Sequence, residues 1–337
     1  MCNQQEESNP LQRLVALRAC WHAVAYGSEV SSEPKAVTLL DDPIVLWRNT
    51  AGRVLALDDL CIHRGTALSR GKICNDEIAC AYHGWRYGAN GRCTYIPQLE
   101  DPARVPSKAK LNAYHCEERY GIIWVALNEP RWPLPKVPEF ESSEWRLTPT
   151  GPFPWMADAS RQVENFTDFA HFPFVHPGLL GDPKRTIVPP YNVRVEDNVL
   201  HYQIKRPEAA NTQDFPVFAN EGQQLPERMS SYELHLPYTI VLRLGWGGEQ
   251  AMVYFFASQP VSSNQCIGYC VIARNYNLEQ DDAMLQQFEN VIFKQDQVIV
   301  ESQRPKQVPF DLSEEFHLKF DAVAVEYRRG MKENGFA

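Results

Sequence analysis

Two pairs of metal-ligating side chains lie close together in the first third of the sequence. Cys61 and His63 form one pair, and Cys80 and His83 form the other. Four such side chains could bind structural zinc, but zinc fingers place two cysteines together and then two histidines on a helix. Here each pair is mixed and lies in a turn between predicted strands. This arrangement favours a two-iron cluster in which two thiolates hold one iron and two imidazoles hold the other.

A second group of potential ligands occurs in the segment ENFTDFAHFPFVH, where Asp168, His171 and His176 stand among phenylalanines. We predict a short helix over Arg161–Phe172 that Pro173 ends. Asp168 and His171 would share one face of this helix, and His176 would follow in the next turn. Two neutral imidazoles and one carboxylate leave open positions on ferrous iron, which is the ligand set used for oxygen chemistry.

The third iron ligand is expected on a long helix near the C-terminal end of the sequence. We predict this helix over Asp281–Gln303, because apolar residues recur there at helical spacing: Leu285, Phe288, Ile292 and Ile299. Asp296 lies at the edge of this stripe, where an unpaired charge would be costly unless a metal compensated for it. Asp296 is therefore the predicted third ligand. Glu289 lies at a similar angle around the helix and is the alternative ligand. A buried salt bridge is the alternative explanation for the position of Asp296.

The elements that must position these residues fall into two groups. Short β-forming runs separated by turns fill the first part of the chain and predict an all-β module. Four prolines in the segment EPRWPLPKVPEF oppose regular hydrogen bonding, so we expect two domains, at 1–130 and 131–337. The second domain combines the two predicted helices with further strands, which makes the expected fold class α+β. These strands include Tyr238–Leu244, Ala251–Ala257 and Ile267–Ala273.

Composition excludes several classes of protein. The chain has 33 basic and 42 acidic residues and a net charge of -9, which gives no electrostatic footprint for nucleic acid or an anionic membrane. No apolar run approaches the ~20 residues of a membrane span, and the start, MCNQQEESNP, lacks the features of a secretory signal. Without such a signal, Cys2 and most of the other cysteines are expected to be free thiols. We therefore expect a soluble, cytoplasmic protein.

The motifs resemble those of one enzyme family. The blocks CIHRGTALS and CAYHGWRY resemble the two halves of a Rieske [2Fe–2S] domain, although that domain usually has proline where Ile62 and Ala81 stand. The segments ENFTDFAHFPFVHPG and VIVESQRP resemble the iron-binding segments of Rieske non-haem iron oxygenases. The resemblance extends from Trp21 to about Arg329. It points to the α-only monooxygenases, which include methylxanthine N-demethylases, O-demethylases of aromatic methyl ethers and hydroxylases of saxitoxin-like alkaloids.

The resemblance implies a fold, a set of cofactors and an assembly. The fold would be an N-terminal Rieske β-domain and a helix-grip (START-like) catalytic domain with an antiparallel sheet and a long C-terminal helix. The cofactors would be a Rieske [2Fe–2S] cluster and mononuclear Fe(II), with O2 as co-substrate. Members form head-to-tail homotrimers, in which Asp168 would connect His83 of one subunit with His171 of the next. The sequence has no GxGxxG motif, so NAD(P)H would act through a separate reductase or ferredoxin.

The implied reaction is hydroxylation of a C–H bond in a small, largely apolar or heterocyclic compound. It becomes N- or O-demethylation when the carbon is a methyl group on nitrogen or oxygen. Ring or alkyl hydroxylation without demethylation is the alternative and would use the same residues. A Rieske electron-transfer protein and a zinc-stabilised binding protein are the other classes that we consider. The apolar strands Tyr238–Gly245 and Val253–Ala257 suggest a pocket for a neutral aromatic or polycyclic compound. The alternating residues of these strands could equally belong to the hydrophobic core.

Overall fold

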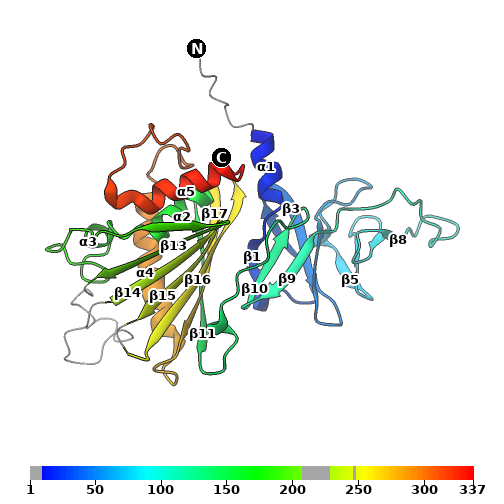
Figure 1. Cartoon of the computed structure of the whole chain (residues 1–337). Coiled ribbons are helices and arrows are strands. Elements are labelled where there is room, and N and C mark those ends of the chain that lie inside the picture. The colour runs from blue at the N-terminus through cyan, green and yellow to red at the C-terminus, as the bar shows by residue number, and fades with distance from the viewer. Residues whose placement is uncertain (1–9, 207–227, 246–247) are drawn as a thin grey trace, which may run out of the picture. The chain divides into compact units, whose positions relative to one another are not determined.

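The computed structural model describes residues 10–206, 228–245 and 248–337 of the chain (Figure 1). It divides into two compact units. One comprises residues 18–133, and the other comprises residues 134–337 together with the segment before residue 18. The predicted domains are 1–130 and 131–337. The first segment, with helix α1 (Pro10–Arg18), is therefore expected in the first domain, whereas it groups with the second unit.

The unit 18–133 consists of three small antiparallel sheets. Their strand orders are β1-β10-β9, β2-β3-β4 and β5-β6-β7-β8. The strands are β1 (His22–Tyr26), β2 (Lys35–Leu39), β3 (Asp42–Arg48), β4 (Val54–Asp58), β5 (Lys72–Cys74), β6 (Glu77–Ala79), β7 (Arg86–Tyr87), β8 (Cys93–Tyr95), β9 (His115–Arg119) and β10 (Ile122–Ala126). All of these pairs except β1 with β10 join consecutive strands through short turns, as the alternation of β-forming runs and turn residues predicts. The expected all-β module is confirmed.

The cysteines of the first motif belong to the core of this unit. Cys61 and Cys80 are buried in one cluster with Trp47, Leu57 and Tyr87, which are fully buried. The two turns that carry the cysteines thus bury both sulfurs in this core. Each of the eight cysteines among the described residues is a free thiol. Cys2 lies outside the described residues.

The second unit is built on a seven-stranded antiparallel sheet of order β11-β17-β16-β15-β14-β13-β12. Its strands are β11 (Arg146–Trp155), β12 (Val193–Glu196), β13 (Val199–Arg206), β14 (Arg228–His235), β15 (Thr239–Gly245), β16 (Ala251–Ser262) and β17 (Gln265–Arg274). The helices are α1, α2 (Ala159–Thr167), α3 (Phe172–Val175), α4 (Asp282–Val300) and α5 (Ala322–Glu333). Figure 1 shows α4 running along one face of the sheet. The predicted α+β class with an antiparallel sheet and a long helix is confirmed.

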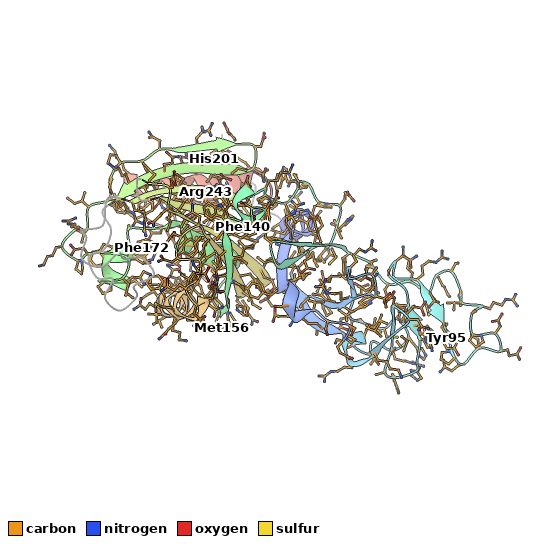
Figure 2. The ribbon with its side chains drawn as sticks, turned by 90° about the horizontal axis from the view of Figure 1, so that it is seen from below. Tyr95, Phe140, Met156, Phe172, His201 and Arg243 are labelled. Carbon is orange, nitrogen blue, oxygen red and sulfur yellow. The ribbon has the colours of Figure 1, made fainter. Side chains whose placement is uncertain are left out.

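Helix α4 begins and ends with side-chain hydrogen bonds. Asp281 caps it by accepting a hydrogen bond from the backbone N–H of Ala283 at 2.9 Å. At the other end, Glu301 accepts one from the N–H of Met156, which follows β11 (Figure 2). These two contacts fix both the start of α4 and its position along β11.

The prediction that Ile299 belongs to the buried face of α4 is wrong. Ile299 is 47% exposed, whereas Val300 is 1% exposed. Ile299 lies only about 20° from Ile292 around the helix, so periodicity alone predicts its burial. In the last turn of α4 the buried positions are Asp296 and Val300. None of the helices in the described ranges is long and apolar enough to cross a membrane.

Candidate metal centres and substrate pocket

Two turns with the same backbone pattern carry the cysteine–histidine pairs. In the first, the N–H of Gly65 donates to the carbonyl of Cys61 at 2.8 Å; in the second, the N–H of Gly84 donates to the carbonyl of Cys80 at 3.0 Å. Both glycines have positive φ, 69° and 72°, a conformation that side chains with a Cβ rarely adopt. The second turn is also closed by the N–H of Cys80 and the carbonyl of Trp85 at 2.8 Å. The short local motif thus determines its own geometry.

The turns separate the thiols from the imidazoles. Cys61 and Cys80 are 3% and 4% exposed, whereas His63 and His83 are partly exposed. The two imidazole rings lie 4.5 Å apart between centroids, and the ring of His63 stacks on Trp85. Two buried sulfurs next to two more exposed imidazoles fit a two-iron cluster in which the histidine-bound iron is nearer to solvent.

A hydrogen bond supports one of the thiols. The hydroxyl of Tyr87 lies 3.1 Å from Sγ of Cys61. Burial raises the pKa of the Cys61 thiol, and this contact with Tyr87 opposes the rise. A donor at this position would stabilise the thiolate that a cluster requires. The sequence does not reveal this role of Tyr87, because a hydroxyl contact across the core has no signature in the local spacing.

His171, His176 and Asp296 come together in the second unit. Their ligand atoms all lie within 4.8 Å of one another. Nε2 of His176 is 2.9 Å from Oδ1 of Asp296, and Nε2 of His171 is 3.4 Å from the same oxygen. His176 is fully buried and Asp296 is 6% exposed. The structure therefore brings Asp296, and not Glu289, to the two histidines.

The local path of the chain at Asp168 differs from the predicted helix. Helix α2 ends at Thr167, and Asp168 has extended backbone angles. Its Oδ1 accepts the N–H of Ala170 at 2.8 Å, which turns the chain before His171. Asp168 and His171 therefore meet across a turn and not on one helical face. Pro173 does not end a helix but lies at the start of α3, where its fixed φ and missing N–H are tolerated.

Both histidines are oriented by a second contact. Nδ1 of His171 is 2.8 Å from Oδ2 of Asp168, and Nδ1 of His176 is 2.7 Å from Oε1 of Gln295. These contacts leave Nε2 of each ring directed at Asp296, which is the arrangement of a metal site whose ligands are held by outer partners. The sequence did not reveal Gln295, because its polar side chain resembles those on the exposed face of α4.

The electrostatics of the site favour a bound cation. Burial lowers the pKa of His171, but its hydrogen bonds with Asp168 and Asp296 outweigh burial and raise it to about 9. Burial raises the pKa of Asp296, but its contacts with His171 and His176 lower it overall. Two carboxylates thus attract positive charge to this buried point. Two imidazoles and a carboxylate are also the donor types that ferrous iron takes in oxygenases, so the residues present fit such an ion.

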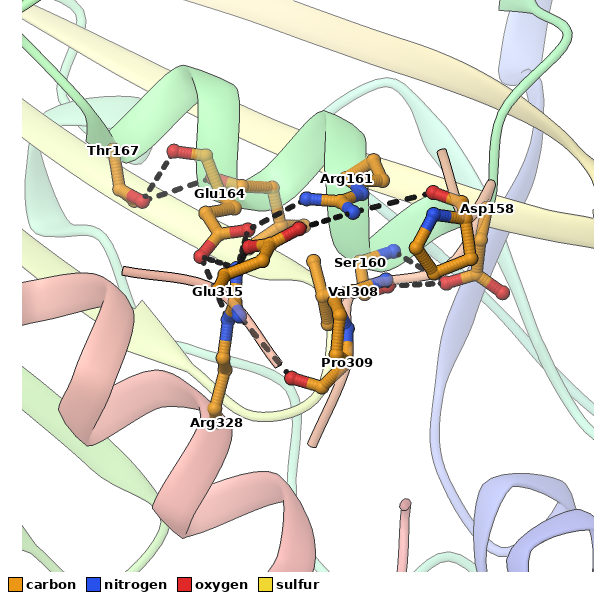
Figure 3. A network of polar contacts seen from close by, with 11 residues as sticks. Asp158, Ser160, Arg161, Glu164, Thr167, Val308, Pro309, Glu315 and Arg328 are labelled. Carbon is orange, nitrogen blue, oxygen red and sulfur yellow. Dashed lines mark hydrogen bonds and ion pairs between the residues drawn. The ribbon is translucent and has the colours of Figure 1, made fainter. Parts of the chain in front are cut away.

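A network of four charged side chains, in which both arginines are buried, anchors α2 (Figure 3). Arg328 on α5 donates from Nε and Nη2 to the two carboxylate oxygens of Glu164 at 3.0 and 2.9 Å. Arg161 donates to Glu315 at 2.7 Å, and Glu315 also accepts from Arg328. Paired contacts of this kind fix orientation as well as distance. The network holds α2, and therefore the turn after it, against segments from the last part of the chain.

A cavity that opens to solvent lies beside His171 and Asp296. Apolar side chains from the sheet and α4 form most of its walls, among them Leu242, Leu244, Phe288 and Ile292. Of the two strands proposed to line a pocket, β15 contributes Leu242 and Leu244. In β16, Tyr254 faces the cavity, whereas Val253 and Phe255 are packed in the core. These strands therefore form part of the pocket wall and part of the protein core.

Comparison with protein families assigns both halves of the chain. Residues 20–114 match the Rieske [2Fe-2S] domain, and residues 155–334 match the vanillate O-demethylase oxygenase C-terminal domain. The chain belongs to the Rieske non-haem iron oxygenases. A zinc-stabilised binding protein and an electron carrier without catalysis do not account for a catalytic domain of this type.

Individual relatives cover nearly the whole of this oxygenase. Methylxanthine N1-demethylase NdmA of Pseudomonas putida is 32% identical over 327 residues, which are 94% of this chain and 89% of NdmA. Methylxanthine N3-demethylase NdmB of the same organism is 31% identical over 343 residues, 98% of this chain and 93% of NdmB. The solved structure of P. putida CBB5 NdmA with caffeine has a TM-score of 0.85 at 29% identity and covers 96% of this chain and 92% of that chain.

The family determines the cofactors and the general reaction. This oxygenase uses a Rieske [2Fe–2S] cluster, mononuclear iron and O2, and it receives electrons from a separate reductase to oxidise a small molecule. The predicted family, fold class and cofactors are confirmed.

Proposed function

We propose that this oxygenase removes N-methyl groups from an uncharged heterocycle. The observation that carries the proposal is the position of His171 and Asp296 on the wall of a largely apolar cavity between the sheet and α4. Its mostly apolar lining with a few polar groups is typical of small-molecule sites. The similarity to two methylxanthine N-demethylases supports both the reaction and the class of substrate.

Each metal centre has a proposed set of ligands. The domain 1–130 holds the cluster through four residues: Cys61, His63, Cys80 and His83. The domain 131–337 holds iron through three: His171, His176 and Asp296. The geometry of the two turns and the mutual distances of the three iron ligands support these assignments.

The side chains divide the work of the reaction. When bound, the iron supplies oxygen activation and the cluster supplies electrons; one oxygen atom enters the methyl C–H bond, the other leaves as water, and two electrons and two protons are consumed. The apolar walls exclude bulk water and hold the heterocycle beside His171 and Asp296. Asp168 and Gln295 keep the histidine rings in place. The hydroxymethyl group formed on nitrogen then leaves as formaldehyde, and the nitrogen takes a proton.

We propose that three copies form a head-to-tail ring in which Asp168 joins the two metal centres. Its side chain is 38% exposed although it contacts His171, so a neighbouring subunit can reach it. In the ring, His83 of one subunit would bond Asp168 of the next. Asp168→Asn should keep both metals and the trimer but lose most turnover. After mixing with substrate and O2, its pre-reduced cluster should stay reduced while the wild-type cluster reoxidises. Rapid reoxidation with normal product yield would contradict this role.

A cytoplasmic location is also part of the proposal. None of the eight described cysteines forms a disulfide, as expected where thiols are kept reduced. The required reductase would draw on NAD(P)H in the same compartment.

Formaldehyde release tests the proposed reaction. The purified holoenzyme with a surrogate reductase should be offered N-methyl heterocycles, O-methyl aromatics and unmethylated analogues. We expect about one formaldehyde per O2 from the N-methyl compounds, none from the unmethylated ones, and none from His176→Ala. Hydroxylated products without formaldehyde across the whole panel would instead show ring or alkyl hydroxylation.

A further inference from the structure

The cavity contains a buried carboxyl group that the proposed metal chemistry does not use. Glu289 lies on α4, is 3% exposed and lines the cavity with Tyr254 of β16. The hydroxyl of Tyr254 donates to Oε1 of Glu289 at 2.8 Å. Glu289 precedes Asp296 by two helical turns, so it lies on the same face about 10 Å further along the wall. It is therefore near the substrate space but away from the iron ligands.

The surroundings of Glu289 favour its uncharged form. Burial raises its pKa to about 8; the Tyr254 hydrogen bond opposes this rise and the Asp296 carboxylate adds to it. Arg228 on β14 lines the same cavity, and Cys270 on β17 is the further titratable neighbour. A protonated carboxyl offers one O–H donor and keeps acceptor capacity on the same group. Because Tyr254 occupies one acceptor site, the donor and the remaining acceptor site can serve a ligand.

We propose that Glu289 and Tyr254 form a dyad that recognises the polar edge of an uncharged cyclic amide or imide. Such an edge places a carbonyl acceptor beside an N–H donor, which complements a carboxylic acid with two hydrogen bonds. This inference rests on the proposed function, and it specifies the substrate class of the same cavity. A cationic ligand is disfavoured by the guanidinium of Arg228. An anionic ligand would meet the Asp296 carboxylate, and the apolar walls would not solvate its charge.

A purely structural role accounts for Glu289 less well. An unneeded carboxyl is costly in a wall formed by Phe288, Ile292 and Phe293, where an apolar side chain of similar size would pack without desolvation. Glu164 shows the contrasting case, since its buried carboxylate is held by both donors of Arg328. Glu289 is bonded by one hydroxyl and faces an open cavity. A polar group in this setting typically gives orientation to a bound ligand.

Two methylxanthines provide matched probes. Theobromine has an N–H between two carbonyl groups in its six-membered ring, and caffeine has a methyl group on that same nitrogen. Both would be titrated calorimetrically into the anaerobic holoenzyme with its cluster reduced. We expect wild-type protein to bind theobromine about five- to tenfold more tightly than caffeine, as one buried hydrogen bond allows. Glu289→Leu should lose this preference, and Tyr254→Phe should reduce it.

The conservative variant separates recognition from packing. Glu289→Gln keeps a donor and an acceptor but cannot titrate, so it should retain the preference. Theobromine binding to wild-type protein should weaken as pH rises through about 8, because the donor is lost, whereas binding to Glu289→Gln should stay flat. Glu326→Gln makes the same exchange on α5, outside the cavity, and should keep the wild-type pH dependence.

Several outcomes would overturn the dyad. Unchanged preference in Glu289→Leu with full iron content and cluster absorbance would do so, as would failure of the wild type to bind theobromine. Failure of the proposed function gives a different result, since no N-methyl heterocycle would then release formaldehyde in any variant. If formaldehyde is released but wild type and Glu289→Leu show the same preference between the two probes, the recognition role of Glu289 and Tyr254 is contradicted and the proposed demethylation still stands.

Discussion

The two metal-binding regions are built in different ways. In residues 18–133 each cysteine–histidine pair lies within one turn, and each turn closes on its own hydrogen bonds. In the other unit His176 and Asp296 are 120 residues apart in sequence and meet through α3 and α4. A local turn keeps its shape with little help from distant segments, whereas a site with distant ligands depends on the packing of whole elements. Changes far from the metals should therefore disturb the iron site more than the cluster.

Loss of one cluster ligand should have the largest effect. Cys80→Ala removes one of the two proposed thiolates, so the protein should lose its red-brown colour and all turnover. Because the iron site belongs to another unit, its iron should remain. Visible absorbance and iron content per chain check both expectations. Full colour in Cys80→Ala would show that the thiolates lie elsewhere.

Removal of the distant carboxylate tests the other half of the comparison. Asp296→Ala should leave the cluster spectrum intact but lower the iron content by about one per chain and abolish turnover, because a facial ligand set needs its carboxylate. Glu289→Ala is the matched control on the same helix and should keep its iron. If the two variants behaved the other way round, Glu289 would be the ligand.

Breaking the anchor of α2 should destabilise the second unit without touching either metal. Arg328→Met leaves Glu164 with Arg161 alone, 3.7 Å away, and loss of one partner from a buried ion pair costs up to about 3–5 kcal/mol. We expect lower resistance to denaturant and earlier loss of iron, with the cluster spectrum persisting. Arg329→Met, at the exposed next position, should change stability by less than about 0.5 kcal/mol. Equal effects of the two substitutions would remove the anchoring role.

The smallest effect is expected from the titration of Glu289. Its pKa is about 8 in the folded chain against an ordinary value of 4.5, so the folded state binds more protons between these values. The free energy of unfolding should therefore decrease as pH rises through this window, and remain level above it. Glu289→Gln lacks this contribution. The difference between its melting temperature and that of the wild type should therefore shift in favour of the variant as the pH rises from about 6 to about 9. Parallel melting profiles would contradict the buried, protonated state.

The same contrast explains what the sequence could predict. The ligand set Cys61, His63, Cys80 and His83 could be predicted from the local sequence, because each pair lies in a short turn whose glycine has positive φ. The sequence predicts Asp296 as the third ligand, but helical angle alone does not exclude Glu289, since both lie on the buried face of one helix. Only the position of α4 against α3 brings one of them within 2.9 Å of His176.

Helix ends and outer contacts were the least predictable features. Helix α2 was expected to continue to Phe172, but it ends at Thr167 because the side chain of Asp168 bonds the N–H of Ala170. Periodicity cannot show this, since the same aspartate could stand within a helix. Gln295 and Tyr254 were not identified for a similar reason. Their partners, His176 and Glu289, are 119 and 35 residues away, so no local pattern reveals the contact.

The anchor of α2 also determines the order in which the protein can be completed during synthesis. Arg328 follows Glu164 by 164 residues, and Glu315 follows Arg161 by 154. At ribosomal speeds of about 5–20 residues per second, roughly 8–30 s pass between the synthesis of α2 and that of its partner on α5. Both cluster turns exist well before then. A nascent chain can thus form its cluster site early, while the iron site becomes rigid only after α5 has been made.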